Sequence, residues 1–429
     1  MGSYCELYIN ECPIYDSKSY VDPAVMTIFR ESDKRVYSRK VSERNQYYWG
    51  HLEKDDETEI AYQYANIVRN IKQRLEIMGF TLNRVKNEFD LLKKQKIEGL
   101  HSNLEEAIKD LEAIWEEELR LLESSSFDDF LSSFKEIIDR KLFLSSRLSD
   151  NEKPLIRYII GNEGAFYHNF PCYDFRSFLR AVLEVSPEES LVVQDITELV
   201  NAGYYDPDDE VCELAIEELL GDPISEKIII LTEGSTDKNV LEKSLKLLYP
   251  HLVGYYSFMD FGIANASGGA SCLVSTIKSF VGSGIGNRII ALFDNDTAAK
   301  VAIKGLKKTI IPQNIKIFNY PDIEVAKNYP TLGPSGISKL NINGLACSIE
   351  LYFGNDVLAQ PDGQLIPIQW KGYDESINQY QGELLRKQDL QNAFFEKLDR
   401  CFNNNNLLEQ ADWSGMKLIL EVIFKAFQE

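Results

Sequence analysis

Two short apolar segments of this 429-residue chain each end in carboxylate side chains. The segments are IIILTEGSTD at 228–237 and IIALFDND at 289–296. Runs of β-branched and aliphatic residues of this length are typical of buried parallel strands. The carboxyl ends of parallel strands share one edge of an open α/β sheet, so their acids can meet around one point. The acids in question are Glu233, Asp237, Asp294 and Asp296.

A cluster of four carboxylates predicts a divalent metal site. Like charges repel one another and need a cation, and ligation by oxygen alone selects Mg²⁺ or Mn²⁺. We expect Glu233, Asp294 and Asp296 to be catalytic residues and metal ligands, with Asp237 as a further ligand. The alternative is that both segments are only turns after core strands, because Asp, Asn, Gly and Ser dominate turns.

The residues around the acids predict alternating strands and helices. Gly234 leaves room at the strand-to-helix turn, and Ser235 or Thr236 can cap a helix with apolar side chains at helical spacing. The later elements are a strand at 255–258, an amphipathic helix opened by Gly268 and Gly269, and a last strand at 315–318. Alternation of this kind predicts a small parallel sheet.

A basic helix is expected directly after the second acidic segment. Thr297 can cap it, and the spacing of its lysines places them on one face. These lysines are Lys300, Lys304, Lys307 and Lys308. We expect Lys300, Lys304 and Lys308 to contact the phosphates of a nucleic acid, and the alternative is an ordinary solvated helix face.

The first half of the chain predicts a different architecture. Short apolar segments and a basic stretch in the first fifty residues indicate an arm that contains β-structure. From Glu59 to Leu92 apolar residues recur in steps of three and four, which predicts a long amphipathic helix with Gly79 as its weak point. Three more helix predictions follow: one started by a capping box at 102–105, one over 127–148, and one over 191–200 after the cap residues at 186–189. Together these helices predict an antiparallel bundle.

Composition and charge limit the possible functions. A hydrophobic content of 44% is ample for real cores, and the length suggests two to three domains. The formal charge of −21 argues against a protein that coats nucleic acid through its whole surface, so any such contact must be local. The seven cysteines form no CxxC pair, which disfavours zinc ribbons and redox dithiols. With no apolar run of membrane length, we expect a cytoplasmic protein without a membrane partner.

The two acidic segments resemble the signature of the Toprim domain, a Glu-Gly after one strand and an Asp-x-Asp after a later one. That domain occurs in topoisomerases, primases and the OLD-type nucleases. A helical bundle fused to Toprim resembles the bacterial HEPN/Toprim proteins, and the segment at 329–354 looks like the C-terminal part of that family. The resemblance implies an α/β plus all-α chain. Its expected regions are a β-containing arm at 1–52, a HEPN-like bundle at 53–222, a Toprim domain at 223–320 and a Toprim-associated region at 321–429.

The resemblance also implies a function. Strand-passage and zinc modules are not evident, so the expectation is a metal-dependent endonuclease acting on DNA or RNA, tRNA included. The alternative is a non-catalytic nucleic-acid-binding or assembly subunit. An additional downstream carboxylate holds a second metal in the OLD-type enzymes, and Glu350 is the matching position, with Asp322 and Glu324 as further candidates. Glu350 can equally be a helix-surface acid.

Partners are implied in the same way. Such proteins often act in bacterial anti-phage defence, in some cases with an ATPase partner, and we expect an oligomer. The chain has no GxxxxGK[ST] motif, so the ATPase must be supplied in trans. HEPN domains often carry an Arg-x4-6-His ribonuclease motif, and the match here, Arg44 to His51, lies before the predicted bundle. A scaffold or partner-binding role is therefore favoured for the HEPN-like part.

Overall fold

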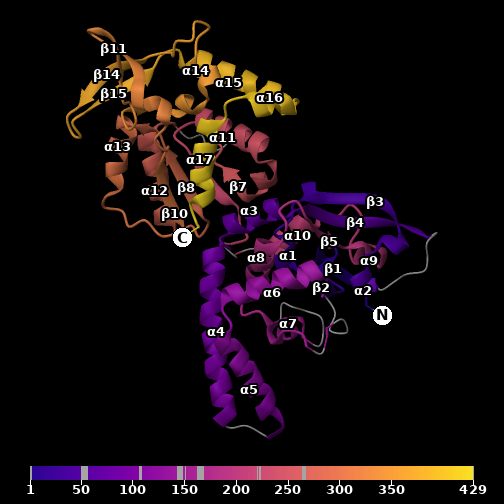
Figure 1. Cartoon of the computed structure of the whole chain (residues 1–429). Helices are drawn as coiled ribbons and strands as arrows, with labels where there is room; N and C mark the ends of the chain where they lie inside the picture. Colours follow the sequence, from indigo (N-terminus) through magenta and orange to yellow (C-terminus); the bar gives the residue numbers. More distant parts are fainter. Residues whose placement is uncertain are drawn as a thin grey trace. The chain divides into compact units, whose positions relative to one another are not determined.

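The computed structural model describes most of the chain, namely residues 2–49, 57–105, 109–142, 148–149, 151–161, 169–219, 221, 224–262 and 267–428. Two compact units make up the chain (Figure 1). The first comprises Met1–Ser225 with Gln428–Glu429, and the second comprises Glu226–Phe427. Among the described residues, no helix has both the length and the apolar character that a membrane crossing requires.

An antiparallel sheet of five strands lies in the first unit, in the order β2-β1-β5-β4-β3. The strands are β1 Tyr4–Ile9, β2 Cys12–Lys18, β3 Lys34–Lys40, β4 Thr58–Ile67 and β5 Leu191–Asp195. The central strand β5 lies more than a hundred residues further along the chain than β1 and β4, the two strands with which it pairs. The β-structure expected in an N-terminal arm is therefore part of a sheet that also draws on later segments.

Helices complete the first unit. The first three along the chain are α1 Pro23–Met26, α2 Gln46–Trp49 and α3 Val68–Met78. The others are α4 Leu82–Glu105, α5 Lys109–Ser124, α6 Phe127–Arg140, α7 Pro154–Ile160, α8 Phe175–Val185, α9 Thr197–Asn201 and α10 Val211–Glu218. Helices α4 and α5 lie side by side as a hairpin (Figure 1). Phenylalanine rings hold α4, α6 and α8 together, as in the 5.0 Å contact between Phe89 and Phe130.

Two segments predicted to be helical are strands. The stretch at 58–67 is β4, because Ile60, Tyr62 and Tyr64 also alternate with period two and the strand pairs with both β3 and β5. The stretch at 191–195 is β5, and Ser186 ends α8 rather than starting a new helix. Tertiary pairing decided both segments, so the first unit is a mixed α/β structure and the expected all-helical bundle arrangement is not observed.

Other helix boundaries also differ from expectation. Gly79 interrupts the long helix as predicted, with a left-handed φ of 99° at the end of α3. The expected start at Ser102 is wrong, since Ser102 lies inside α4 and its hydroxyl donates to the Glu98 carbonyl, 3.2 Å away. Helix α6 begins at Phe127 as predicted but ends at Arg140, where Lys141 adopts a left-handed conformation. Part of the remaining prediction, 143–147, falls outside the described residues.

The second unit contains the predicted parallel sheet, in the order β10-β8-β6-β7. Its strands are β6 Ile228–Leu231, β7 Tyr256–Phe258, β8 Ile289–Phe293 and β10 Ile315–Asn319. The helices after its strands are α11 Ser235–Leu248, α12 Ala270–Ser283 and α13 Thr297–Ile303. Strand β8 is buried along its whole length, which explains its continuous apolar sequence.

A second sheet follows in the chain, in the order β12-β11-β14-β15. Its strands are β11 Tyr329–Gly333, β12 Gly336–Leu340, β14 Ile368–Asp374 and β15 Gln379–Leu384. A two-residue ladder between β9 Asn295–Asp296 and β13 Ala346–Cys347 joins the chain after β8 to this region. The last helices are α14 Asn355–Leu358, α15 Lys387–Phe402, α16 Asn405–Gln410 and α17 Ser414–Lys425.

Candidate active site

The carboxyl edge of the parallel sheet brings Glu233 and Asp294 together. Glu233 follows β6 and Asp294 follows β8, and these strands are hydrogen-bonded neighbours. The Asp294 backbone N–H donates to Glu233 Oε1 over 2.9 Å, which fixes the glutamate side chain across the edge. The Gly269 N–H donates to the Glu233 carbonyl over 2.6 Å. A Cβ on Gly268 would lie only 3.2 Å from that carbonyl oxygen, so this approach favours glycine.

Burial and mutual repulsion perturb these acids. Burial raises the pKa of Glu233 to about 7, and the neighbouring Asp296 contributes. Asp237 lies in the first turn of α11, and burial together with Glu350 and Glu233 raises its pKa to about 7. Burial, Asp237 and Glu233 raise the pKa of Asp294 well above its usual value. At each of these three acids, the charge of a neighbouring acid therefore contributes to the raised pKa.

Glu350 reaches the same site from a different part of the chain. The pairing of β13 with β9 brings the following 3₁₀ turn, Ile349–Tyr352, to the sheet edge. Glu350 is 3% exposed, which excludes the alternative of a surface acid. Ser348 Oγ donates to its Oε2 over 2.5 Å and Gln391 Nε2 donates to its Oε1 over 2.7 Å. Lys387 Nζ lies 3.8 Å from Glu350 Oε2.

Four of the five predicted acidic ligands line one cavity of about 360 Å³. Its lining includes Glu233, Asp237, Asp294, Ser348, Glu350, Lys387 and Gln391. Lys387 stands in the first turn of α15. Burial acts to lower the pKa of its ammonium group, but Glu350 and Asp294 outweigh that effect and raise it. The cavity thus combines several carboxylates with one cation.

Asp296 has a different position. One of its oxygens accepts from the Ala299 N–H over 2.7 Å, so it caps α13 in place of the predicted Thr297. The other accepts from Gln381 Nε2 over 2.9 Å. Asp296 lines a second, adjoining cavity rather than the first. The two aspartates of the Asp-Asn-Asp segment therefore have separate local roles.

The donor set fits a hard divalent cation. Asp294 Oδ1 is buried and has no hydrogen-bond partner, so this carboxyl oxygen has unused acceptor capacity. Within the described ranges, no three His, Cys, Asp or Glu side chains stand close enough to form a ready ligand group. Mg²⁺ often keeps several waters and binds through one or two carboxylates and a substrate phosphate. The arrangement suits that mode better than a closed protein cage.

The lysines expected to form one helical face are distributed differently. Helix α13 ends at Ile303, and a 3₁₀ turn at Lys304–Leu306 follows, so the predicted helical spacing is interrupted. Lys304 Nζ donates to the Ser376 carbonyl over 2.8 Å. Lys300 is partly buried, and Lys308 is exposed.

The sequence did not indicate three polar residues that line the cavity, namely Ser348, Lys387 and Gln391. Their only signal was position, since Ser348 stands two residues before Glu350 and Lys387 begins a helix in a basic stretch. The weaker acidic candidates lie elsewhere. Asp322 accepts from Asn295 Nδ2 over 2.8 Å, and Glu324 is an exposed partner of Lys327.

Of the Arg44-to-His51 match to the HEPN ribonuclease motif, the structure describes only Arg44. Arg44 forms ion pairs with Glu59 at 2.5 Å and with Glu198 at 3.0 Å, and its guanidinium lies 4.7 Å from the Trp49 ring centroid. His51 lies outside the described residues. The contacts of Arg44 therefore serve the packing of β4 and α9.

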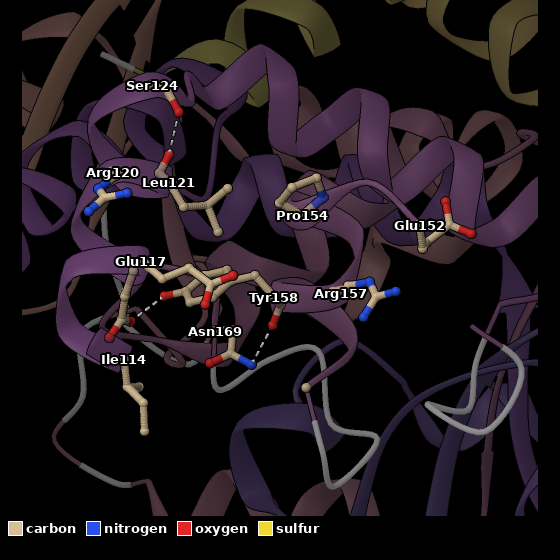
Figure 2. A pocket seen from close by; sticks show the side chains of 12 residues that line it. Ile114, Glu117, Arg120, Leu121, Ser124, Glu152, Pro154, Arg157, Tyr158 and Asn169 are labelled. Atoms are coloured by element: carbon tan, nitrogen blue, oxygen red, sulfur yellow. Dashed lines mark hydrogen bonds between the residues drawn. The ribbon is translucent and has the colours of Figure 1, made fainter. Parts of the chain in front are cut away.

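A larger cavity of about 870 Å³ lies in the first unit between α5 and α7 (Figure 2). Tyr158 and Asn169 stand in its wall, and Asn169 Nδ2 donates to the Tyr158 carbonyl over 2.8 Å. The Tyr158 hydroxyl donates to Glu118, which also pairs with Lys96 at 2.7 Å. Mutual pairing satisfies these polar groups, whereas Asp294 Oδ1 in the acidic cavity has no hydrogen-bond partner.

Comparison with known proteins identifies the first unit. A family model described as HEPN/Toprim N-terminal domain 1 matches residues 1–218, about half of the chain, and the match ends with α10. No curated protein and no solved structure matches the chain. A domain of this family supports a nuclease-like or nucleic-acid-related role. The matched residues do not include the acidic cavity, so its assignment depends on motif and geometry.

Proposed function

The chain belongs to the HEPN/Toprim family, and from this premise we propose that it is a divalent-metal-dependent endonuclease. Its substrate would be the phosphodiester backbone of DNA or RNA, tRNA included. The observation that supports this most is the buried unpaired oxygen of Asp294 in a cavity with Glu233, Asp237 and Glu350. Burying like charges without partners is costly, so such a cluster favours a functional role over a structural one.

Each residue has a proposed role. Asp294, Asp237 and Glu350 would hold Mg²⁺ or Mn²⁺, together with Glu233. Asp296 could join them, since each carboxylate oxygen has further acceptor capacity beyond its bonds to Ala299 and Gln381. A bound ion would supply charge stabilisation for the attacking and leaving oxygens.

Glu233 is the proposed general acid or base. A pKa of about 7 is matched to proton transfer near neutral pH. Its carboxylate accepts from the Asp294 N–H and from the Ala270 N–H, which orient it in the cavity. Lys387 remains positively charged among the acids and can bind a phosphate oxygen. Gln391 and Ser348 hold Glu350 in place.

The biological setting is proposed from the family resemblance. We place the protein among effectors of bacterial anti-phage defence, acting as an oligomer with an ATPase supplied in trans. Lys300, Lys304 and Lys308 are proposed phosphate contacts beside the site, with Lys304 released from the Ser376 carbonyl. The first unit would act as a scaffold or partner-binding module, because Arg44 is engaged by Glu59 and Glu198.

A substrate panel tests this function against a non-catalytic subunit. The absence of a ready three-residue ligand group among the described side chains is the observation that favours the alternative. Purified protein is incubated with plasmid, single-stranded DNA and total tRNA in Mg²⁺, Mn²⁺ or EDTA. The endonuclease predicts cleavage that EDTA abolishes. Tight binding of these nucleic acids without cleavage in either metal would instead support an assembly or binding subunit.

A further inference from the structure

A second cavity of about 200 Å³ adjoins the acidic one. It is lined by Asp296, Ala346, Ser348, Lys371, Gln381, Gly382, Glu383 and Lys387. Ser348 and Lys387 line both cavities, so these two side chains stand at the boundary between them. Pockets for whole small molecules usually measure about 300 to 1,000 Å³. The smaller space suits a single phosphate group rather than a complete nucleotide.

Lys371 is the cation that belongs to the second cavity alone. It occupies the bulge of β14, where the pairing with β15 skips from Trp370 to Gly372. A bulge re-aims a side chain that regular pairing would fix. Lys371 Nζ lies 3.2 Å from Glu383 Oε2, and both side chains are 50% exposed. An exposed pair of this kind contributes little stability, so Lys371 can turn to an incoming anion at small cost.

Asp296 and Lys387, which also line this cavity, already have partners in the protein. Asp296 accepts from the Ala299 N–H and from Gln381 Nε2, so its charge is partly compensated. Lys387 Nζ faces the acidic cavity through Glu350 at 3.8 Å. Lys371 and Lys387 together therefore present two cations along the passage from one cavity to the next.

We propose that this second cavity binds the phosphate that neighbours the scissile one on the same strand. The inference depends on the proposed function, because it takes the acidic cavity as the position of the scissile phosphate. Lys371 would contact the neighbouring phosphate and Lys387 would stand between the two. The consequence is a substrate requirement: two consecutive phosphodiesters bind better than one.

Binding of short oligonucleotides in Ca²⁺ tests the subsite without requiring turnover. A labelled trinucleotide carries two phosphodiesters and a dinucleotide carries one, and fluorescence anisotropy gives Kd for each. Wild-type protein should prefer the trinucleotide. Lys371→Gln should lose most of that preference, about tenfold for one charge-assisted hydrogen bond. Glu383→Gln should strengthen it, because Lys371 is freed from its partner.

Lys339→Gln is the matched control, since Lys339 is an exposed lysine of the same sheet on β12. It should keep the wild-type preference. An unchanged preference in Lys371→Gln would overturn the subsite. So would an equal loss for both oligonucleotides, since Lys371 would then serve the scissile position. Hydrolysis of bis(p-nitrophenyl) phosphate, a single diester, tests the proposed function separately. If the protein cleaves nothing but prefers the trinucleotide in a Lys371-dependent way, the phosphate subsite stands and the proposed endonuclease activity is refuted.

Discussion

Buried charge is arranged in opposite ways in the arginine pairs of the first unit and in the acidic cavity of the second. In the first unit, buried arginines face carboxylates directly. Arg74 is fully buried and lies 2.5 Å from Asp33, and Arg39 lies 2.6 Å from Asp195. In the acidic cavity of the second unit, the buried acids lie beside one another with Lys387 among them, and Asp294 Oδ1 has no hydrogen-bond partner. Paired buried charges specify a structure, whereas unpaired like charges mark a place where something else must bind.

Removing one partner of a buried pair should produce the largest effect. Arg74→Met leaves Asp33 buried without its cation and removes the donor to the Ile28 carbonyl, so the first unit should lose about 3 kcal/mol or more of unfolding free energy. Arg69→Met on the same helix is the control. Its pair with Glu189 is exposed and should matter by about 0.5 kcal/mol at most. Chemical denaturation, monitored by hydrogen exchange of peptides from the first unit, measures the unfolding free energy of both variants. Equal losses of unfolding free energy in the two variants would contradict the comparison.

The same operation on the acidic cavity should have the opposite sign. Asp294→Asn removes a carboxyl group whose charged form is disfavoured by burial, Asp237 and Glu233, so the metal-free second unit should not be destabilised and should gain stability at pH values high enough to ionise Asp294. Binding of Mg²⁺ should weaken in titration calorimetry because an anionic oxygen is removed. Asp389→Asn, at an exposed partner of Arg386, should change neither quantity. A destabilised Asp294→Asn with unchanged Mg²⁺ affinity would mean that Asp294 is a structural turn residue.

The stability of the second unit should depend on pH because of its buried acids. Glu233 and Asp237 have pKa values of about 7, above those of an unfolded chain. A raised pKa favours the protonated folded state, so this stabilisation is complete below about pH 4 and is lost as pH rises through 7. Without metal, the second unit should therefore melt at a lower temperature at pH 8 than at pH 6. Saturating Mg²⁺ should restore more stability at pH 8. A melting temperature that is independent of pH over this range in metal-free protein would contradict the mutual repulsion.

The surface lysines should give the smallest effect on the fold. A triple change of Lys300, Lys304 and Lys308 to glutamine should leave metal binding intact and weaken nucleic-acid binding. The slope of affinity against salt should fall by about 0.7 to 0.9 for each phosphate that the protein no longer neutralises. Lys339→Gln serves again as a control on the same unit. An unaltered slope would show that these lysines are a solvated surface.

Local sequence predicted the parallel sheet well, because each strand is a short apolar run followed by turn chemistry. The rule that parallel strands share an edge predicts that Glu233, Asp237, Asp294 and Asp296 meet; the first three line one cavity, and Asp296 lines the adjoining one. Long-range pairing was harder to foresee. Residues 58–67 satisfy both a helical and a strand period, and only their neighbours β3 and β5 decide between them. Lys387 joins the site by tertiary packing, which its own segment does not reveal.

The most direct test of nuclease chemistry at the acidic cavity is cleavage by Glu233→Gln of whichever nucleic acid the wild-type protein cuts in Mg²⁺ or Mn²⁺. The substitution keeps the side-chain volume and the bond from the Asp294 N–H but removes the carboxylate. Glu324→Gln, at an exposed acid of the same unit, is the control. Single-turnover cleavage should fall at least about a hundredfold in Glu233→Gln, in the range of a missing general acid or base, with an unchanged circular dichroism spectrum and full activity in the control. A folded Glu233→Gln protein that cleaves at the wild-type rate would contradict the claim that the acidic cavity carries out the nuclease reaction.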